Sequence, residues 1–221
     1  MRRHADIFVF WSKIKRGQKI HPDDVPAFKR MEPQRHGFQL RCLPACFSGP
    51  LRTAPIVLLF LSPGYVGSED AEAKTNAGKD YYYRKWRGKE PLRDDGGPGT
   101  TWFKSRTKRF ADYQIARKKI AILNIGAYHS KRMGSYASML ALPSSRVTLD
   151  WAQNYLFREA MAGKRIVICM RSAAYWGLEP GKRYPGTLFA PRTLRNGHLR
   201  KNTESERLVQ LVRRRLGANS N

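Results

Sequence analysis

The stretch IVLLFLSPGYVGSED, residues 56–70, decides the fold class of this chain together with KIAILNIGAYHSKR, residues 119–132. Each begins as a continuous apolar run without polar alternation, which is typical of a strand buried on both faces of a parallel sheet. Each then ends in a small polar loop. Because ligands bind at the carboxyl ends of strands in open α/β sheets, we expect the Ser62–Tyr65 loop and the Asn124–Ser130 loop to form opposite walls of one cleft.

The rest of the chain continues the alternation of strands and helices. RIVICMR (165–171) reads as a third buried strand and TLFA (187–190) as a short fourth. Helices are predicted at 102–117 and 150–162, and TESERLVQLVRRRL (203–216) is a closing helix that begins with a capping box. This order predicts an α/β fold with three layers, α/β/α, around a central four-stranded parallel sheet.

The length of the chain fits a single domain. With 221 residues, of which 41% are hydrophobic, it can bury one core, and no stretch demands a second. Residues 1–50 are predicted to form a helical N-terminal extension packed on that domain, with short helices at 5–17 and 23–32. The polar and aromatic segment 66–100, which contains DDGGPG, is predicted to be a mobile or substrate-covering loop.

Positive charge dominates the composition. Lys and Arg number 42 against 17 Asp and Glu, which gives a formal net charge of +25. The basic residues are spread along the chain with Tyr, Trp and Phe between them, a pattern that suits phosphate neutralisation combined with base stacking. We therefore expect DNA, single- or double-stranded, as the partner. The alternative is a generally basic surface without a nucleic-acid role.

Other classes of protein are disfavoured. The chain has no apolar run of about 18 residues, and its N-terminus lacks the long apolar stretch and small-residue cleavage site of an export signal. We expect a cytoplasmic monomer that contacts no membrane. Cys42, Cys46 and Cys169 are odd in number and match no paired zinc pattern, so reduced thiols, no metal and no cofactor are expected.

Four short blocks resemble the uracil-DNA glycosylase superfamily. LFLSPGYVG resembles the loop after that family's first strand, which reads GQDPYH or G-[IM]-N-P-G and positions the hydrolytic water. IAILN resembles the next strand, whose Asn pairs with the target base, and VICMRSAAYWG is similar to a later strand that reads LLWG. TLFAPRTLRNGHLRKN occupies the place of the family's last motif, HPSPL, but contains no HPSP.

The resemblance implies base removal from DNA, which needs an extruded nucleotide, a base pocket, an oriented water and stabilisation of the leaving base. Together with the positions of the strand ends, it yields three sets of candidates. The catalytic candidates are Ser62, Asp70, His129 and His198. The base-binding candidates are Gly64, Tyr65, Tyr82, Phe103, Asn124 and Tyr128. The DNA phosphate-binding candidates are Ser130, Lys131, Arg171, Arg195, Asn196 and Lys201.

Several of these residues also have a purely structural interpretation. Ser62-Pro63-Gly64 is an ordinary turn sequence, Asn124 can bind a neighbouring backbone group, and a lone His is commonly a loop residue. Ser62 stands where the family has Asp or Asn and is a poor base, so Asp70 or Glu69 is the candidate to orient water. Otherwise the leaving base and the basic cleft would carry a dissociative path.

The same loop bears on the substrate. In the strict uracil enzymes a Tyr two places after the Asp excludes a 5-methyl group, whereas Gly64 stands in that place here. The resemblance thus implies a wider pocket, suited to a bulky 5-substituted cytosine such as the hydroxymethylated or glucosylated base of phage DNA, and a role in phage defence.

Three functions remain open from the sequence. The first is a monofunctional DNA glycosylase that removes a modified or deaminated base. The second is a catalytically silent nucleic-acid-binding module on the same fold, favoured by the loss of the Asp and of HPSP. The third is an unrelated α/β hydrolase or nucleotide-binding enzyme, for which the chain has no GxSxG, P-loop or GxGxxG motif.

Overall fold

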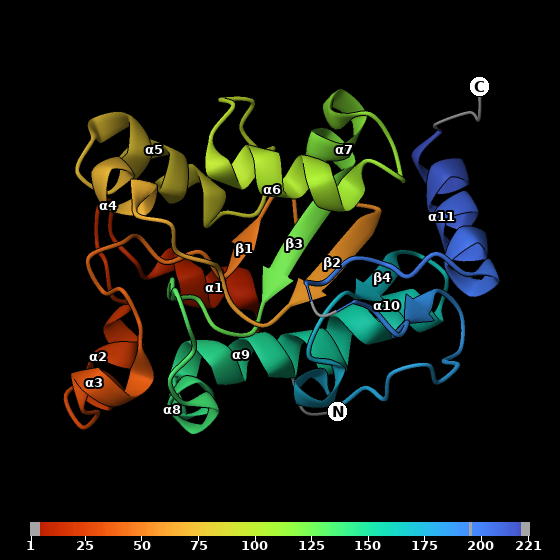
Figure 1. Ribbon diagram of the computed structural model, residues 1–221. Helices are drawn as coiled ribbons and strands as arrows, with labels where there is room; N and C mark the ends of the chain where they lie inside the picture. Colours follow the sequence, from red (N-terminus) through yellow and green to blue (C-terminus); the bar gives the residue numbers. More distant parts are fainter. Residues whose placement is uncertain (1–4, 195, 218–221) are drawn as a thin grey trace.

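The computed structural model describes residues 5–194 and 196–217 and has an α/β fold (Figure 1). The strands are β1 (Phe47–Ser48), β2 (Ile56–Phe60), β3 (Ile120–Asn124), β4 (Ile166–Cys169) and β5 (Leu188–Phe189). Within the described ranges they form one five-stranded sheet in the order β1-β3-β2-β4-β5. β2 to β5 pair in parallel, as predicted, whereas β1 is antiparallel to β3, so the sheet is mixed.

The helices before β2 and between β2 and β3 account for most of the N-terminal half. They are α1 (Ile7–Ser12), η1 (Pro22–Asp24), α2 (Val25–Phe28), α3 (Pro33–His36), α4 (Ser68–Glu72), α5 (Asn76–Lys85), α6 (Pro98–Thr107) and α7 (Tyr113–Lys119). The predicted helix 102–117 is thus two helices. Asp112 starts the second one, because its side chain accepts a hydrogen bond from the Ile115 N–H.

The helices of the second half follow β3, β4 and β5. They are α8 (Tyr136–Ala141), α9 (Pro143–Trp151), the π-helical turn η2 (Ala152–Leu156), α10 (Phe157–Met161), η3 (Ala173–Trp176) and α11 (Thr203–Leu216). Pro143 is the first residue of α9, a position where its missing N–H costs nothing. The helical segment predicted over 150–162 therefore begins earlier, at Pro143. The closing helix, α11, lies where it was predicted.

Helices cover both faces of the sheet, as Figure 1 shows for α6 and α7 above the strands and α9 and α10 below them. Ile56, Leu58 and Phe60 pack into a cluster with residues of α6, α7 and α11, whereas Val57 and Leu59 pack into another with residues of α1, α9 and α10. All five are buried, which is the reason why β2 has no polar alternation.

Two segments differ from their predicted form. The N-terminal 50 residues contribute β1 to the sheet and Trp11 to the core, where its ring stacks on Trp86, the residue that follows α5. The segment predicted as a mobile loop, 66–100, contains α4 and α5 and the start of α6. Tyr81, Tyr82 and Trp86 of this segment are buried, and this burial explains why it is helical despite its polar composition.

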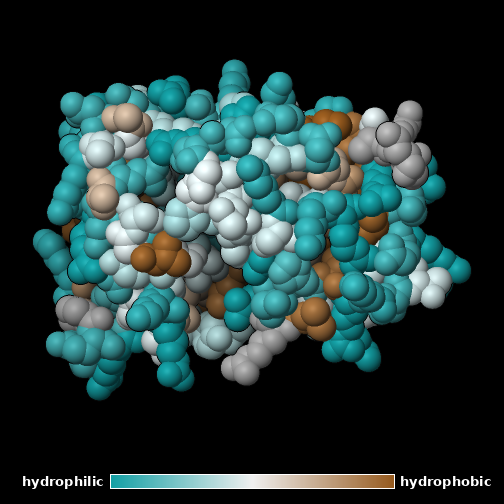
Figure 2. All heavy atoms as spheres, turned by 45° about the horizontal axis from the view of Figure 1, so that its top comes forward, coloured by the Kyte–Doolittle hydropathy of each residue, from teal (hydrophilic) through white to brown (hydrophobic). Residues whose placement is uncertain are grey.

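The surface is mostly hydrophilic with small, separate hydrophobic patches, as Figure 2 shows for one face. No helix among the described residues is both long and apolar enough to cross a membrane. Cys42, Cys46 and Cys169 are unpaired and buried, and burial raises the pKa of each thiol to about 12.

Candidate nucleic-acid interface

The carboxyl edge of the parallel strands is the place where this topology puts a ligand. β2 is the first parallel strand along the chain, and it lies between β3 on one side and β4 on the other. After β2 the chain adds β3 on one side of it and then crosses to the other side to add β4, so the order of strands reverses between β2 and β4. In doubly wound sheets ligands bind outside the carboxyl ends of the strands at such a switch point.

The two loops singled out in the sequence lie side by side at this edge. The Gly126 N–H donates to the Leu61 carbonyl (2.8 Å) and the Ser130 N–H to the Pro63 carbonyl (3.2 Å). A Cβ atom added at Gly126 would lie 3.5 Å from the Ser62 Cβ. The Ser62–Tyr65 loop and the loop that follows Asn124 are thus brought together.

A turn after β5 crosses the same edge. Thr193 and Leu199 pair as an antiparallel bridge, and Gly197 between them has a φ of +80°. A Cβ atom at Gly197 would lie 3.3 Å from the Phe60 ring at the end of β2 and 3.7 Å from the Met170 carbonyl oxygen after β4. The turn therefore covers the switch point.

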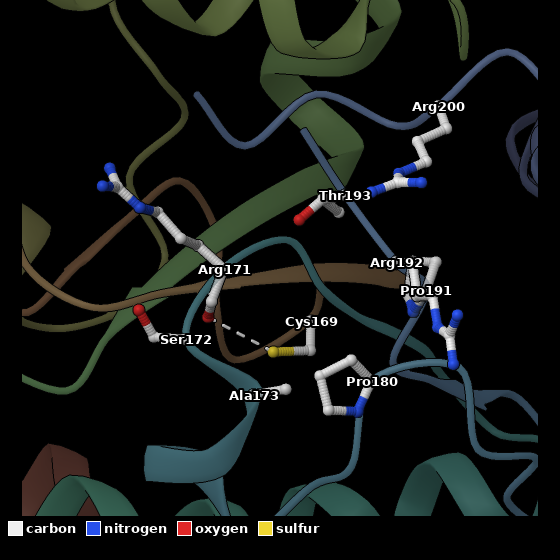
Figure 3. Close-up of a pocket in the computed structure, with 9 residues that line it drawn as sticks. All are labelled: Cys169, Arg171, Ser172, Ala173, Pro180, Pro191, Arg192, Thr193 and Arg200. Carbon is white, nitrogen blue, oxygen red and sulfur yellow. Dashed lines mark hydrogen bonds between the residues drawn. The ribbon is translucent and has the colours of Figure 1, made fainter. Parts of the chain in front are cut away.

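A pocket of about 280 Å³ opens beside this turn, at the ends of β4 and β5 (Figure 3). Its lining carries three arginines and no acidic residue, and it consists of Cys169, Arg171, Ser172, Ala173, Pro180, Pro191, Arg192, Thr193 and Arg200. The three arginine residues are exposed. Arg106 of α6 extends this basic region, because its guanidinium donates to the Asn196 carbonyl (3.0 Å).

Burial and neighbouring positive charges lower the pKa values of two residues of this region, Arg106 and His198. Burial, and then the charge of Arg171, lowers the pKa of Arg106, and no carboxylate offsets either effect. Burial and the charges of Arg106 and Lys108 likewise lower the pKa of His198, so its imidazole is neutral at pH 7. The positive field at this edge favours an anionic ligand.

His129 is buried between the two strand-end loops. Its Nδ1 lies 2.6 Å from the Gly64 carbonyl oxygen, so Nδ1 carries the proton that this carbonyl accepts. Burial lowers its pKa, and its buried Nε2 has no hydrogen-bond partner among the described residues. A neutral His129 in this tautomer can accept a hydrogen bond at Nε2 but cannot donate one there.

Asp70 is a carboxylate bound by three donors. Its Oδ1 accepts from the Cys42 thiol (3.0 Å), and its Oδ2 accepts from the Tyr65 hydroxyl (2.8 Å) and pairs with the Arg41 guanidinium (2.5 Å). The Cys42 hydrogen bond, followed by those from Tyr65 and Arg41, lowers the pKa of Asp70. Asp70 is therefore ionised at neutral pH. Ser62, at the start of the Ser62–Tyr65 loop, is partly exposed.

Asn124 has the backbone contact that its structural interpretation predicts. Its amide nitrogen donates to the Ala45 carbonyl (3.0 Å), and its backbone N–H donates to the Cys46 carbonyl (2.7 Å). The side chain thereby ties the end of β3 to the residues before β1, and it is 6% exposed. Recognition of a base by Asn124 stays a prediction.

Three of the predicted base-contacting rings are in the core. Phe103 is fully buried, Tyr82 packs edge-on against Trp86, and the Tyr128 hydroxyl donates to the buried Asp24 carboxylate. These rings have no exposed face on which a base can stack in this conformation. Tyr65 is partly exposed and Gly64 is exposed, so these two remain accessible members of the predicted set.

The predicted phosphate-binding residues divide by exposure. Lys131, Arg171, Asn196 and Lys201 are exposed, whereas Ser130 is buried and its backbone N–H is bound by Pro63. Arg195 lies outside the described residues. The structure thus places Arg171 and Asn196 at the switch point and Ser130 inside the loop contact.

Several surface residues at this edge were missed by sequence reasoning. Arg192 and Arg200 line the pocket, Leu194 is 48% exposed on the turn, and Tyr136 stacks on Tyr175. The run APRTLRNGHLRK offered one signal, because basic residues recur in it around two leucines, Leu194 and Leu199. The Tyr136–Tyr175 contact joins residues 39 positions apart and had no local signal.

Comparison of the chain with family profiles, with curated proteins and with solved structures finds no match. Among the residues with described positions, no three or more His, Cys, Asp and Glu side chains are grouped so that they could hold a metal ion.

Proposed function

We propose that this protein is a DNA glycosylase that binds DNA at the carboxyl edge of the sheet and hydrolyses the N-glycosidic bond of an extruded base. The observation that carries the proposal is the meeting of three strand-end segments at one basic edge. The 62–65 loop touches the 126–130 loop, and the turn through Gly197 lies over the ends of β2 and β4. The resemblance of the same segments to the uracil-DNA glycosylase superfamily supports the reaction type.

DNA would be held through its phosphates and opened by the turn after β5. Arg171, Arg192 and Arg200 supply charge without a neighbouring acid in the pocket lining. Leu194 exposes an apolar side chain between basic residues, and such side chains insert between base steps and unstack them. Insertion of Leu194 would offset the cost of extruding a nucleotide.

The chemistry would follow a dissociative path. The bond between the sugar C1′ and the base nitrogen breaks, its electron pair leaves with the base, and the oxygen of a water molecule bonds to C1′ while its proton passes to a base or to solvent. Asp70 is an ionised carboxylate of α4 that is bound to Tyr65 of the loop, and it would orient that water after releasing one of its donors. The neutral His198 would stabilise the departing base.

The loop geometry supports a substrate with a large 5-substituent. A Cβ atom built at Gly64 would meet no other atom within 4 Å, so the place occupied by a Tyr side chain in the strict uracil enzymes is open here. A hydroxymethylated or glucosylated cytosine of phage DNA is the substrate class that we propose. Phage defence is the corresponding biological role.

A catalytically silent DNA-binding module is the second candidate, and a specific observation favours it. Both Asp70 oxygens already accept hydrogen bonds, and the Asn124 amide already binds the Ala45 carbonyl. If these contacts persist in the complex, neither residue is free to act on a nucleotide. The two candidates share the binding surface and differ only in base removal.

Asp70→Asn tests the enzyme directly. We expect it to lower the rate of abasic-site formation in oligonucleotides that carry one modified base by on the order of a hundredfold, because a neutral amide orients water poorly. Asp80→Asn is the matched control, since Asp80 on α5 is also an ion-paired carboxylate, bound to Arg16. An Asp70→Asn variant as fast as the Asp80→Asn variant would refute the role of Asp70.

Asn124→Ala extends the same test to the base. It should abolish base removal while leaving the salt dependence of DNA binding intact, because phosphate contacts hold the strand independently of the base. A thermal unfolding measurement on the variant separates this effect from the loss of the Ala45 contact. Unchanged base removal in a folded Asn124→Ala variant would contradict base recognition by Asn124.

A further inference from the structure

An aromatic pair lies on the surface beside the arginine pocket. The rings of Tyr136 and Tyr175 stack with centroids 4.8 Å apart and an interplanar angle of 21°. Tyr175 is partly buried against the core, whereas Tyr136 is 45% exposed. The inner ring therefore supports the outer one, and the outer ring retains surface on which a planar group can stack.

The pair belongs to the same edge of the sheet as the pocket. The Tyr175 N–H donates to the carbonyl of Ser172, which lines the pocket (3.0 Å). Tyr136 begins α8, six residues after Ser130 of the β3 loop. The pair thus joins the segment that follows β4 to the segment that follows β3, and these two strands flank β2 in the sheet.

Ser172 holds this arrangement in a costly backbone conformation. Its φ of 61° makes it the one non-glycine residue with a positive φ in the described part of the chain. Such a conformation is unfavourable for a residue with a side chain and tends to persist at binding sites. Ser172 lies between Arg171, which lines the pocket, and η3, which carries Tyr175.

The three arginines are spread along the pocket mouth. In Figure 3 the Arg171 guanidinium points away from the pocket on the side opposite to Arg192, while that of Arg200 reaches toward Thr193. Guanidinium groups that surrounded one phosphate would converge on one point. Groups that are spread along an edge instead suit successive phosphates of a strand.

We propose that the Tyr136–Tyr175 pair and Arg171, Arg192 and Arg200 form a track for a single DNA strand. A base stacks on Tyr136, and the neighbouring phosphates bind the arginines. This inference rests on the proposed function in that the ligand is DNA, and it adds that the strand flanking the reacting nucleotide is bound unpaired. Stacking on an aromatic ring suits an unpaired base, because a paired base is already stacked in the duplex.

The salt dependence of binding tests the arginines. We expect Arg171→Gln, Arg192→Gln and Arg200→Gln in combination to weaken binding of a single-stranded oligonucleotide and to reduce the slope of log affinity against log salt by about 2, since each lost contact removes about 0.7. The matched control combines Lys118→Gln, Arg158→Gln and Arg214→Gln, which are exposed residues of α7, α10 and α11. Fluorescence anisotropy of a labelled oligonucleotide measures both variants.

Tyr136→Leu tests the stacking platform separately. It should weaken binding of the single strand by on the order of tenfold without changing the salt slope, because stacking releases no counterions. Tyr83→Leu on α5 is the control, since Tyr83 is a partly buried tyrosine whose ring is already covered by the Arg87 guanidinium at 3.8 Å. Thermal unfolding verifies that each variant is folded.

The outcomes distinguish this track from the proposed function. Wild-type protein that binds no DNA would overturn both. Wild-type binding with equal losses of slope in the two triple variants would overturn the track and leave DNA binding in place. A Tyr136→Leu variant that binds the single strand as tightly as the Tyr83→Leu variant would also overturn the track.

Discussion

The Tyr128 hydroxyl group is bound inside the protein by a carboxylate. It donates to Asp24 Oδ2 (2.6 Å) and accepts from the His21 N–H (3.1 Å), while the Ser144 N–H donates to Asp24 Oδ1 (2.9 Å). All four residues are buried. This network ties η1, the β3 loop and α9 together, and each member depends on the others for its hydrogen bonds.

Tyr128→Phe should therefore lower stability and leave DNA binding unchanged. Loss of the hydroxyl leaves the His21 N–H and one Asp24 oxygen without this partner, which costs about 1 to 3 kcal/mol. Thermal unfolding and oligonucleotide anisotropy measure the two effects. Tyr184→Phe, which removes a hydroxyl bound to the Glu179 N–H near the surface, is the control. A Tyr128→Phe variant of normal stability that binds DNA poorly would restore the base-binding role predicted from the sequence.

Individual side chains were harder to predict than the loops that carry them. The sequence placed Asn124 at the end of a buried strand and Tyr128 and His129 in the loop after it, and the structure places them there. It did not indicate that Tyr128 and His129 point inward, because their partners, Asp24 and Gly64, come from distant parts of the chain. Hydrogen bonds between segments far apart in sequence leave no periodic pattern.

At the scale of elements, α5 buries a lysine. Lys85 is 4% exposed, and its Nζ lies 4.3 Å from the centroid of the Tyr82 ring. Burial lowers the pKa of Lys85 to about 8. The unfolded chain keeps the ordinary value near 10.5, so the native state bears the cost of the buried charge at every pH below about 8.

Lys85→Met should stabilise the protein at pH 7. A methionine keeps most of the apolar contact and removes the buried charge, which gives a gain of about 1 to 3 kcal/mol. The gain should shrink as the pH rises from 8 toward 10.5, because the lysine of the unfolded chain then loses its proton as well. Denaturant unfolding at pH 7 and at pH 10 measures it, with Lys74→Met on the exposed surface as the control. A loss of stability at pH 7 would show that the ring contact outweighs the burial cost.

The elements that the sequence predicted well are those with their own local signal. β2, β3 and β4 are continuous apolar runs, and α11 has both an apolar stripe and a capped start. β1 is two residues long and forms because β3 offers an open edge. α4 and α5 were predicted as a loop, since their mixture of Tyr, Lys and Gly has neither strand nor helix periodicity strong enough to see.

At the scale of the whole molecule, the acidic residues are used locally and the basic excess is left over. Asp70, Asp80, Glu72 and Glu206 each pair with an arginine that does not belong to the pocket lining. The pocket at the ends of β4 and β5 has three arginines and no acid. The sequence shows the positive charge only as a total. In the structure, part of it lies without neighbouring acidic residues in the pocket lining, at the edge where the topology places a ligand.

The release of a free base by the wild-type protein tests the central claim most directly. Oligonucleotides that carry uracil, hydroxymethylcytosine or glucosylated hydroxymethylcytosine, and an unmodified control, would be incubated with the protein. Mass spectrometry then detects the free base, and alkali reveals the abasic sites. We predict release of a bulky 5-substituted cytosine, with one abasic site for each base released and none in the unmodified DNA. Tight binding to all of these oligonucleotides with no base released from any of them would contradict the enzyme and leave the DNA-binding module.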